Sequence, residues 1–159
     1  MIKIDTDSAD KLILQLKLLP HEMGVGVRKA VNQSVLMVQA DAKRSIVKIS
    51  GGRVYMRTKA KRGKRGFGRG SRTGIHIASK PGDAPNKDTG TLLKYIVVSK
   101  TKGNTRKGYS ASVRAMVPYA IDLEYGTSRV KARPFMGPAL AKNSKKIQTL
   151  IGNAVRSQL

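Results

Sequence analysis

A stripe of apolar residues runs through positions 27 to 49 and is the clearest pattern in the chain. Its members recur at steps of three and four: Val27, Val31, Val35, Val38, Ala42, Ile46 and Ile49. Because such steps return to one face of an α-helix, the pattern predicts a long amphipathic helix. Leu36 and Met37 widen the stripe and indicate packing on more than one side. The glycines in Ser50-Gly51-Gly52 are typical of a helix end.

A second long helix is predicted from Pro138 to the C-terminus, because proline is favoured in the first turn of a helix. Its expected apolar face consists of Leu140, Ile147, Leu150, Ile151, Ala154 and Val155. Its expected solvent face includes Asn143, Lys145, Lys146 and Gln148.

The beginning of the chain predicts a short strand followed by a short helix. The strand covers Ile2 to Ile4, and the side chain of Asp7 or Ser8 can cap the helix. Pro20 ends this helix or begins the next one. The expected apolar face of the short helix consists of Leu12, Leu16 and Leu19.

Two β-branched segments in the second half of the chain predict an antiparallel hairpin. Residues 92–102 form a short turn followed by an Ile- and Val-rich strand, and residues 103–108 form the connecting loop. Residues 109–117 alternate between apolar and other side chains, which is typical of a half-buried strand. The alternating apolar residues are Tyr109, Ala111, Val113, Ala115 and Val117.

Together these elements predict an α+β fold in a single domain over residues 1–159. We expect a small antiparallel sheet to be packed by the long helix of the N-terminal half and by the C-terminal helix. Residues 53–80 contain no Asp or Glu and many Lys, Arg and Gly. Such a composition cannot bury much apolar surface, so it predicts a long, basic, flexible loop inserted into the domain.

The charge of the chain points to an anionic partner. Thirty-two Lys and Arg face nine Asp and Glu, which gives a formal net charge of +23. This excess favours nucleic acid, an anionic membrane surface or an acidic protein surface, and composition does not choose among them.

The basic insertion contains the candidate contacts to DNA or to a neighbouring connector protein. Backbone contacts to phosphates require charge and flexibility but no sequence readout. Aromatic residues are sparse in this segment, with Tyr55 and Phe67, so base stacking is not indicated. The candidate contact residues are Arg57, Lys59, Lys61, Arg62, Lys64, Arg65, Arg69 and Arg72.

The sequence offers little for catalysis or for metal binding. It has no Cys, and its two histidines, His21 and His76, have no acidic or histidine neighbours at metal-ligand spacing. Asp122 and Glu124 are expected to pair with Lys or Arg rather than with a metal. We therefore expect no enzyme activity, no catalytic residues, no cofactor and no metal. There is no signal-peptide pattern and no apolar stretch of about 20 residues, so no membrane partner is expected.

Residues 119–140 have a plain architectural interpretation. Gly126 can adopt a positive φ and close a sharp turn, and Thr127 can bond the nearby backbone. Glu124 is expected to hold Arg129 or Arg133 across that turn. Pro134 fixes the approach to the aromatic residue that follows it, Phe135, which is expected to anchor the last helix onto the sheet.

The same residues resemble the hallmark of the tail-completion, or neck, family of tailed phages. The matching stretches are Tyr119-Ala120-Ile121-Asp122-Leu123-Glu124-Tyr125-Gly126-Thr127 and Ala132-Arg133-Pro134-Phe135-Met136-Gly137-Pro138-Ala139-Leu140. Upstream, Pro81-Gly82-Asp83-Ala84-Pro85, Asp88-Thr89-Gly90 and Leu92 resemble the Pro-Gly, Pro and Thr-Gly-x-Leu stretch of that family. The basic insertion is longer and more cationic than the family pattern.

The resemblance implies a structural protein of the virion that forms a homo-oligomeric ring at the head–tail junction around the DNA channel. The implied partners are the head connector and the tail tube or terminator proteins. The implied location is the virion, with assembly in the host cytoplasm. The basic insertion is then expected to point toward the lumen or the adjoining connector ring. The implied interface residues are Tyr119, Glu124, Tyr125, Gly126, Thr127, Arg133, Pro134 and Phe135.

Two alternatives remain open from the sequence. Within the particle, the chain could serve as a tail terminator or as a minor capsid component. Outside the particle, it could be a free basic nucleic-acid-binding protein, for which the charge itself is the function.

Overall fold

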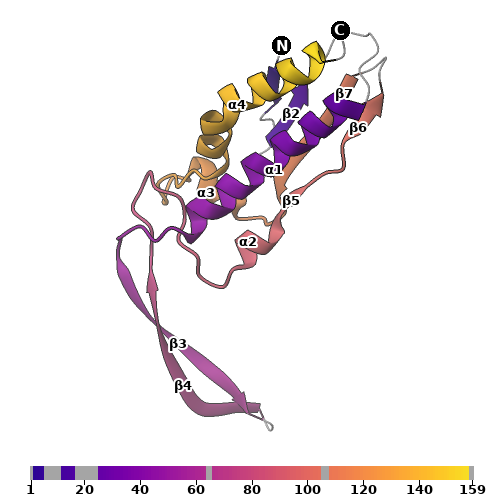
Figure 1. The fold of residues 1–159 in the computed structure, drawn as a ribbon. Helices are drawn as coiled ribbons and strands as arrows, with labels where there is room; N and C mark the ends of the chain where they lie inside the picture. The colour runs from indigo at the N-terminus through magenta and orange to yellow at the C-terminus, as the bar shows by residue number, and fades with distance from the viewer. Residues whose placement is uncertain (1, 6–11, 17–24, 64–65, 105–107, 158–159) are drawn as a thin grey trace.

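The computed structural model describes residues 2–5, 12–16, 25–63, 66–104 and 108–157. It consists of a body of helices and strands from which one long hairpin projects (Figure 1). The elements are β1 (Ile2–Asp5), β2 (Leu12–Leu16), α1 (Val25–Val47), β3 (Val54–Gly63), β4 (Gly66–Ile77), α2 (Thr91–Tyr95), β5 (Ile96–Val98), β6 (Lys102–Asn104), β7 (Gly108–Ala115), α3 (Ala120–Tyr125) and α4 (Met136–Arg156). The predicted α+β class is confirmed.

Helix α1 forms where the apolar stripe predicts it and lies at the centre of the core. Its stripe is buried from Val27 to Ile46, whereas Ile49 follows the helix and is 72 % exposed. The helix packs against β5, β7 and α4. The Gln39 side chain donates a 2.8 Å hydrogen bond from Nε2 to the carbonyl oxygen of Ile96, which ties α1 to β5.

The antiparallel sheet of the body is built around β7. This strand pairs with β2 on one side and with β5 and β6 on the other, and β1 extends the sheet beyond β2. The predicted hairpin of residues 92–117 is thus confirmed, with two short strands in place of one. Strand β7 is more deeply buried than the half-buried strand expected, because Ser112 is buried as well as Val113. The Ser112 hydroxyl bonds the Ser99 hydroxyl at 3.1 Å, which satisfies it inside the sheet.

The predicted strand at the start of the chain is confirmed as β1, but the short helix predicted after it is wrong where the structure describes it. Leu12 and Leu16 lie in β2, paired with β7. The other residues assigned to that helix, Asp7, Ser8, Leu19 and Pro20, lie outside the described residues.

Helix α4 packs along α1, and one of its predicted solvent-facing residues lies inside that contact. Asn143 is only 4 % exposed. Its Nδ2 donates to Oδ2 of Asp41 on α1 at 2.7 Å and to the carbonyl oxygen of Ala139 at 2.8 Å. The sequence predicts that Asn143 faces water. Its side chain can instead be buried between the two helices, because its amide group donates hydrogen bonds to both of these acceptors. Lys145, Lys146 and Gln148 are exposed, as predicted.

The segment 53–80, predicted as an irregular loop, is an antiparallel hairpin over most of its length. Strands β3 and β4 pair from Val54 opposite Ile77 to Gly63 opposite Gly66, with a register shift between Ala60 and Arg62. The α+β class is unaffected, but the insertion is regular structure. In the described residues, no helix combines the length and the apolarity needed to cross a membrane.

Candidate functional site

The hairpin divides its residues between two faces. Successive residues of a strand belong to opposite faces. One face therefore takes the cross-strand pairs Val54–Ile77, Met56–Ile75, Thr58–Thr73 and Ala60–Ser71. The other takes Tyr55–His76, Arg57–Gly74 and Lys59–Arg72. Over these pairs the first face is uncharged and the second carries the Lys and Arg positions.

The candidate DNA contacts are distributed along both strands of this hairpin. Arg57, Lys59, Lys61 and Arg62 belong to β3, and Arg69 and Arg72 belong to β4. The register places Lys59 opposite Arg72. Lys64 and Arg65 lie outside the described residues.

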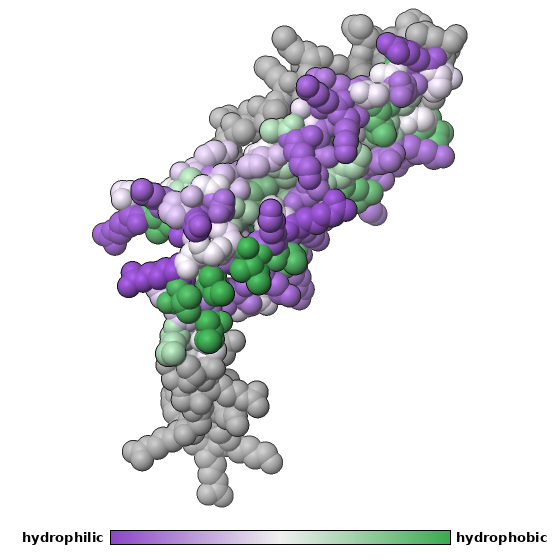
Figure 2. Space-filling model, turned by 60° about the vertical axis from the view of Figure 1, so that its left-hand side comes forward, coloured by the Kyte–Doolittle hydropathy of each residue, from purple (hydrophilic) through white to green (hydrophobic). Residues whose placement is uncertain are grey.

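The root of the hairpin exposes apolar side chains to solvent. Val54 is 59 % exposed, Met56 79 % and Ile75 71 %. Figure 2 shows apolar side chains gathered where the hairpin leaves the body. On the other face, the Arg53 guanidinium lies 5.5 Å from the ring centroid of Tyr55, within the range of a cation–π contact.

At the other candidate site, Glu124 caps the last helix. Its carboxylate accepts backbone N–H bonds from Phe135 at 2.9 Å, Met136 at 3.0 Å and Gly137 at 2.7 Å. These are the free donors at the start of α4, and a negative charge there is favoured by the helix dipole. The pairing of Glu124 with Arg129 or Arg133, expected from the sequence, is therefore wrong. Glu124 is only 7 % exposed, and the nearby donors that satisfy it are backbone groups.

The turn after α3 has the conformation that its glycine predicts. Gly126 has φ of 78°, and a Cβ there would lie 2.8 Å from both Ala132 N and Val130 O. The Thr127 hydroxyl accepts hydrogen bonds from the N–H groups of Arg129 at 3.2 Å and Val130 at 3.0 Å. Both expectations for this turn are confirmed, so the turn returns the chain tightly toward α4.

Arg133 connects this junction to the root of the hairpin. Its backbone N–H donates to Leu123 O at 2.6 Å, and its Nε donates to Ser79 O at 3.3 Å. Ser79 comes two residues after β4. Phe135 is buried in the core at 1 % exposure, and the start of α4 is fixed beside it. The junction therefore joins α3, α4 and the hairpin root through neighbouring residues.

No family model, curated protein or solved structure matches this chain. The site is therefore interpreted from its own geometry.

The interface residues predicted from the sequence fall into two groups. Glu124 and Phe135 are buried and hold the junction together, while Gly126, Arg133 and Pro134 are half-buried. Tyr119, Tyr125 and Thr127 are exposed and remain available to a partner. Sequence reasoning missed Ile121 and Val130, which are 37 % and 41 % exposed. The spacing of Ile121 and Tyr125, one helical turn apart, was the available signal.

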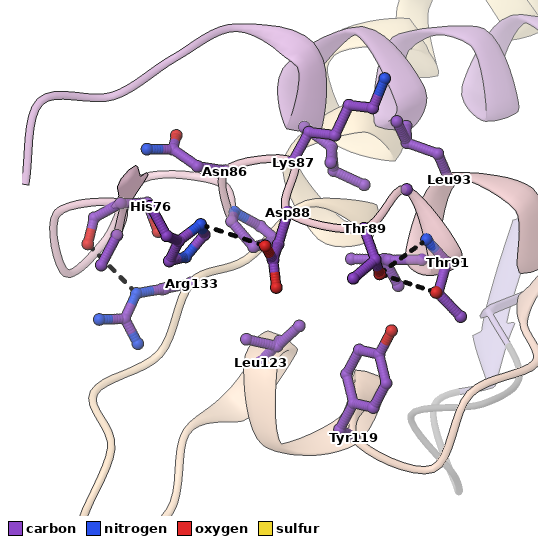
Figure 3. Close-up of a pocket in the computed structure, with 16 residues that line it drawn as sticks. His76, Asn86, Lys87, Asp88, Thr89, Thr91, Leu93, Tyr119, Leu123 and Arg133 are labelled. Atoms are coloured by element: carbon purple, nitrogen blue, oxygen red, sulfur yellow. Dashed lines mark hydrogen bonds and ion pairs between the residues drawn. The ribbon is translucent and has the colours of Figure 1, made fainter. Parts of the chain in front are cut away.

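A hollow of about 330 Å³ lies between the hairpin root and α3. Figure 3 shows Tyr119 and Leu123 on one side and the segment of Asp88 and Thr89 on the other. His76 Nδ1 lies 3.5 Å from Asp88 Oδ1, and the hydroxyls of Thr89 and Thr91 are 2.8 Å apart. Sequence reasoning did not select His76, Asp88, Thr89 or Thr91 as site residues, and their proximity comes from the fold.

This hollow is not arranged as a metal centre. Within the described part of the chain, no group of three or more His, Cys, Asp or Glu side chains could hold an ion. The hollow is lined by hydrogen-bonding and apolar side chains, a combination that suits a peptide segment or a small polar ligand.

Proposed function

We propose that this chain is a structural subunit of the head–tail junction of a tailed phage, which joins the tail to the head connector around the DNA channel. In this role it forms a homo-oligomeric ring, and its partners are the connector and the tail tube or terminator proteins. It uses no cofactor and catalyses no reaction. Its residence is the virion, after assembly in the host cytoplasm.

The observation that carries the proposal is the projecting hairpin. It extends away from the body (Figure 1), its sequence has no acidic residue, and its root exposes apolar side chains. In a free globular protein the apolar root of this projection would stay in water, whereas exposed apolar patches usually mark a contact with another molecule. A subunit of a larger assembly can bury the root against a protein and hold the cationic positions near DNA.

The junction of α3 and α4 is a second, independent observation that supports the proposal. The residues that resemble the tail-completion pattern form one connected unit, from Glu124 through Gly126 to Arg133 and Phe135. This unit sets the angle of α4 and leaves Tyr119 and Tyr125 exposed beside it. A motif of this kind shapes a surface for a neighbour.

Quantitative mass spectrometry of purified particles tests the proposal. Heads and tails of the phage that encodes the chain are separated on a gradient, and the copy number is measured in each fraction. We expect a few copies per particle, in tails or in joined particles. Recovery in heads alone would favour a minor capsid component. Absence from every fraction would rule out a role in the particle.

The cationic face of the hairpin favours one other function, that of a free nucleic-acid-binding protein. This alternative predicts tight, salt-dependent binding of duplex DNA by the monomer, whereas a ring subunit binds weakly as a monomer. The test variant replaces Arg57, Lys59, Arg69 and Arg72 with Gln. The matched control replaces four exposed lysines outside the hairpin, Lys100, Lys131, Lys145 and Lys146.

Binding is measured by fluorescence anisotropy over a series of salt concentrations. If the hairpin binds DNA by itself, the hairpin variant reduces the magnitude of the negative slope of log K against log [salt] by about 3 to 4. The control variant reduces it by less. Equal losses in both variants would indicate diffuse attraction by the net charge.

A further inference from the structure

Among the apolar side chains that the described part of the molecule exposes, two separate groups bear on assembly. The first, called the hairpin surface, consists of Val54, Met56 and Ile75, which are 59 %, 79 % and 71 % exposed. The second, called the α3 surface, consists of Ile121 and Tyr125, one helical turn apart on α3, which are 37 % and 54 % exposed. Since both are exposed in the same chain, neither covers the other.

The hairpin surface is built for contact with protein. Its face of the ladder takes only uncharged residues from Val54 to Ala60 and from Ser71 to Ile77, while Arg57, Lys59 and Arg72 belong to the opposite face. A two-stranded hairpin is marginally stable in water without something to pack against. Exposed apolar residues on such a hairpin therefore indicate a partner that covers this face.

The α3 surface is the complementary place on the molecule. Residues 115–128 contain no Lys or Arg, although the chain has 32 of them. This stretch also presents Asp122, which is exposed, next to Ile121. In a chain of net charge +23, it is a surface that a cationic hairpin can approach without strong repulsion. The exposed Asp122 carboxylate is opposite in sign to the cationic hairpin.

We propose that the hairpin surface of one copy packs on the α3 surface of the next copy. The two surfaces differ, so the contact is head-to-tail, and repetition of it produces a closed ring or an open filament. The contact leaves the cationic face of each hairpin uncovered. This contact would be the interface between neighbouring subunits of the ring. Only the placement of that ring in a virion rests on the proposed function.

Disulfide trapping tests this contact cleanly, because the chain has no Cys. The double variant M56C/I121C is expected to give a ladder of covalent multimers beyond the dimer after mild oxidation. The single variants M56C and I121C are expected to stay monomeric on a non-reducing gel. The control pair M56C/Q148C places the second thiol on the exposed face of α4 and should give no ladder.

A mixing experiment tests the direction of the contact. Met56→Asp removes the hairpin surface and Ile121→Arg removes the α3 surface, and both residues are exposed, so both variants should fold. Each variant alone is expected to be monomeric by light scattering in about 0.15 M salt, where charge repulsion is screened beyond about 8 Å. An equimolar mixture is expected to stop at the dimer, since only one intact contact remains.

Several outcomes would overturn the contact. Efficient dimers from M56C alone would mean that hairpins pair with each other, and equal ladders from the test and control pairs would mean random collision. Wild-type protein that stays monomeric, with no ladder from M56C/I121C, would remove the contact altogether. Mass spectrometry of particles tests the proposed function separately. If M56C/I121C gives a ladder but the protein is absent from particles, the contact stands and the proposed function is wrong.

Discussion

The body and the hairpin of this protein are stabilised in opposite ways. In the body, the apolar stripe of α1 is buried from Val27 to Ile46 against the sheet and α4, and Phe135 and Ile147 are each about 1 % exposed. In the hairpin, β3 and β4 pack chiefly on each other, and the apolar residues at the root stay in solvent. The body thus has an apolar core of its own, whereas the root of the hairpin leaves its apolar side chains exposed.

This difference indicates which region was shaped by a partner. A buried aliphatic core accounts for the apolar residues that α1, β7 and α4 bury, without reference to any other molecule. No residue in the described part of the chain covers Met56 or Ile75, which are 79 % and 71 % exposed. Substitutions should therefore cost folding stability in the body and assembly in the hairpin.

The largest contrast is expected between Phe135 and Met56. Phe135→Ala should lower the free energy of unfolding by about 3 to 5 kcal/mol, because it leaves a cavity in the core. Met56→Ala should change it by less than about 0.5 kcal/mol, because the side chain is 79 % exposed. Urea denaturation of both variants measures the contrast. Similar losses in the two variants would mean that the hairpin surface is covered in the free protein.

Removal of the cap on α4 comes next in size. Glu124→Ala leaves the N–H groups of Phe135, Met136 and Gly137 without their acceptor and should cost about 2 to 3 kcal/mol. Asp122→Ala, on the exposed side of the same helix, is the matched control and should cost less than about 0.5 kcal/mol. Denaturation curves for both variants decide whether the motif is held by this cap, and equal costs would contradict it.

A smaller effect is expected at Asp41, where α1 meets α4. The hydrogen bond from Asn143 lowers the pKa of Asp41 below its ordinary value of 3.8; burial opposes this, while Arg44 and Lys142 add to the lowering. A lowered folded-state pKa contributes stability above the unfolded pKa, and that contribution is lost as pH falls through the folded pKa. Asp41→Asn should therefore cost about 1 kcal/mol at pH 7 and less below pH 4.

Urea titrations of wild type and of Asp41→Asn between pH 7 and pH 3 test this prediction. Asn143→Ala removes the main cause of the shift and should weaken the pH dependence without abolishing it. A gap between wild type and Asp41→Asn that stays constant with pH would show that the ionised carboxylate contributes nothing.

Periodic signals predicted most of the body, because they depend on local geometry alone. The stripe of α1 and the alternation of β7 each repeat many times and predict their elements from sequence. The N-terminal segment shows the limit of this approach. Leu12 and Leu16 fit a helical step of four, but Leu12, Leu14 and Leu16 also fit a strand. Pairing with β7, about a hundred residues away, decides for the strand.

The sequence predicts a flexible loop for residues 53–80 because the many charged residues and glycines suggest one more strongly than the short alternation at its two ends suggests strands. Val54 and Met56 alternate with polar residues, as do Ile75 and Ile77, and these two pairs meet in the register of β3 and β4. That alternation was the signal for a hairpin. The partners of Glu124 could not be predicted in the same way. The sequence offered nearby arginines, but the start of α4 supplies three N–H donors that need an acceptor.

Removal of the whole hairpin is also expected to have little effect on folding. Ala78 N–H donates to Arg53 O at 2.9 Å, so the two ends of residues 54–77 are already adjacent. Replacement of that segment by two glycines should change the free energy of unfolding by less than about 1 kcal/mol, because a shorter loop lowers the closure entropy slightly. The same deletion should abolish the disulfide-trapped ladder and the hairpin's share of DNA binding. A body that fails to fold without the hairpin would mean that the two regions depend on each other for stability, and their contrast would then not reveal a partner.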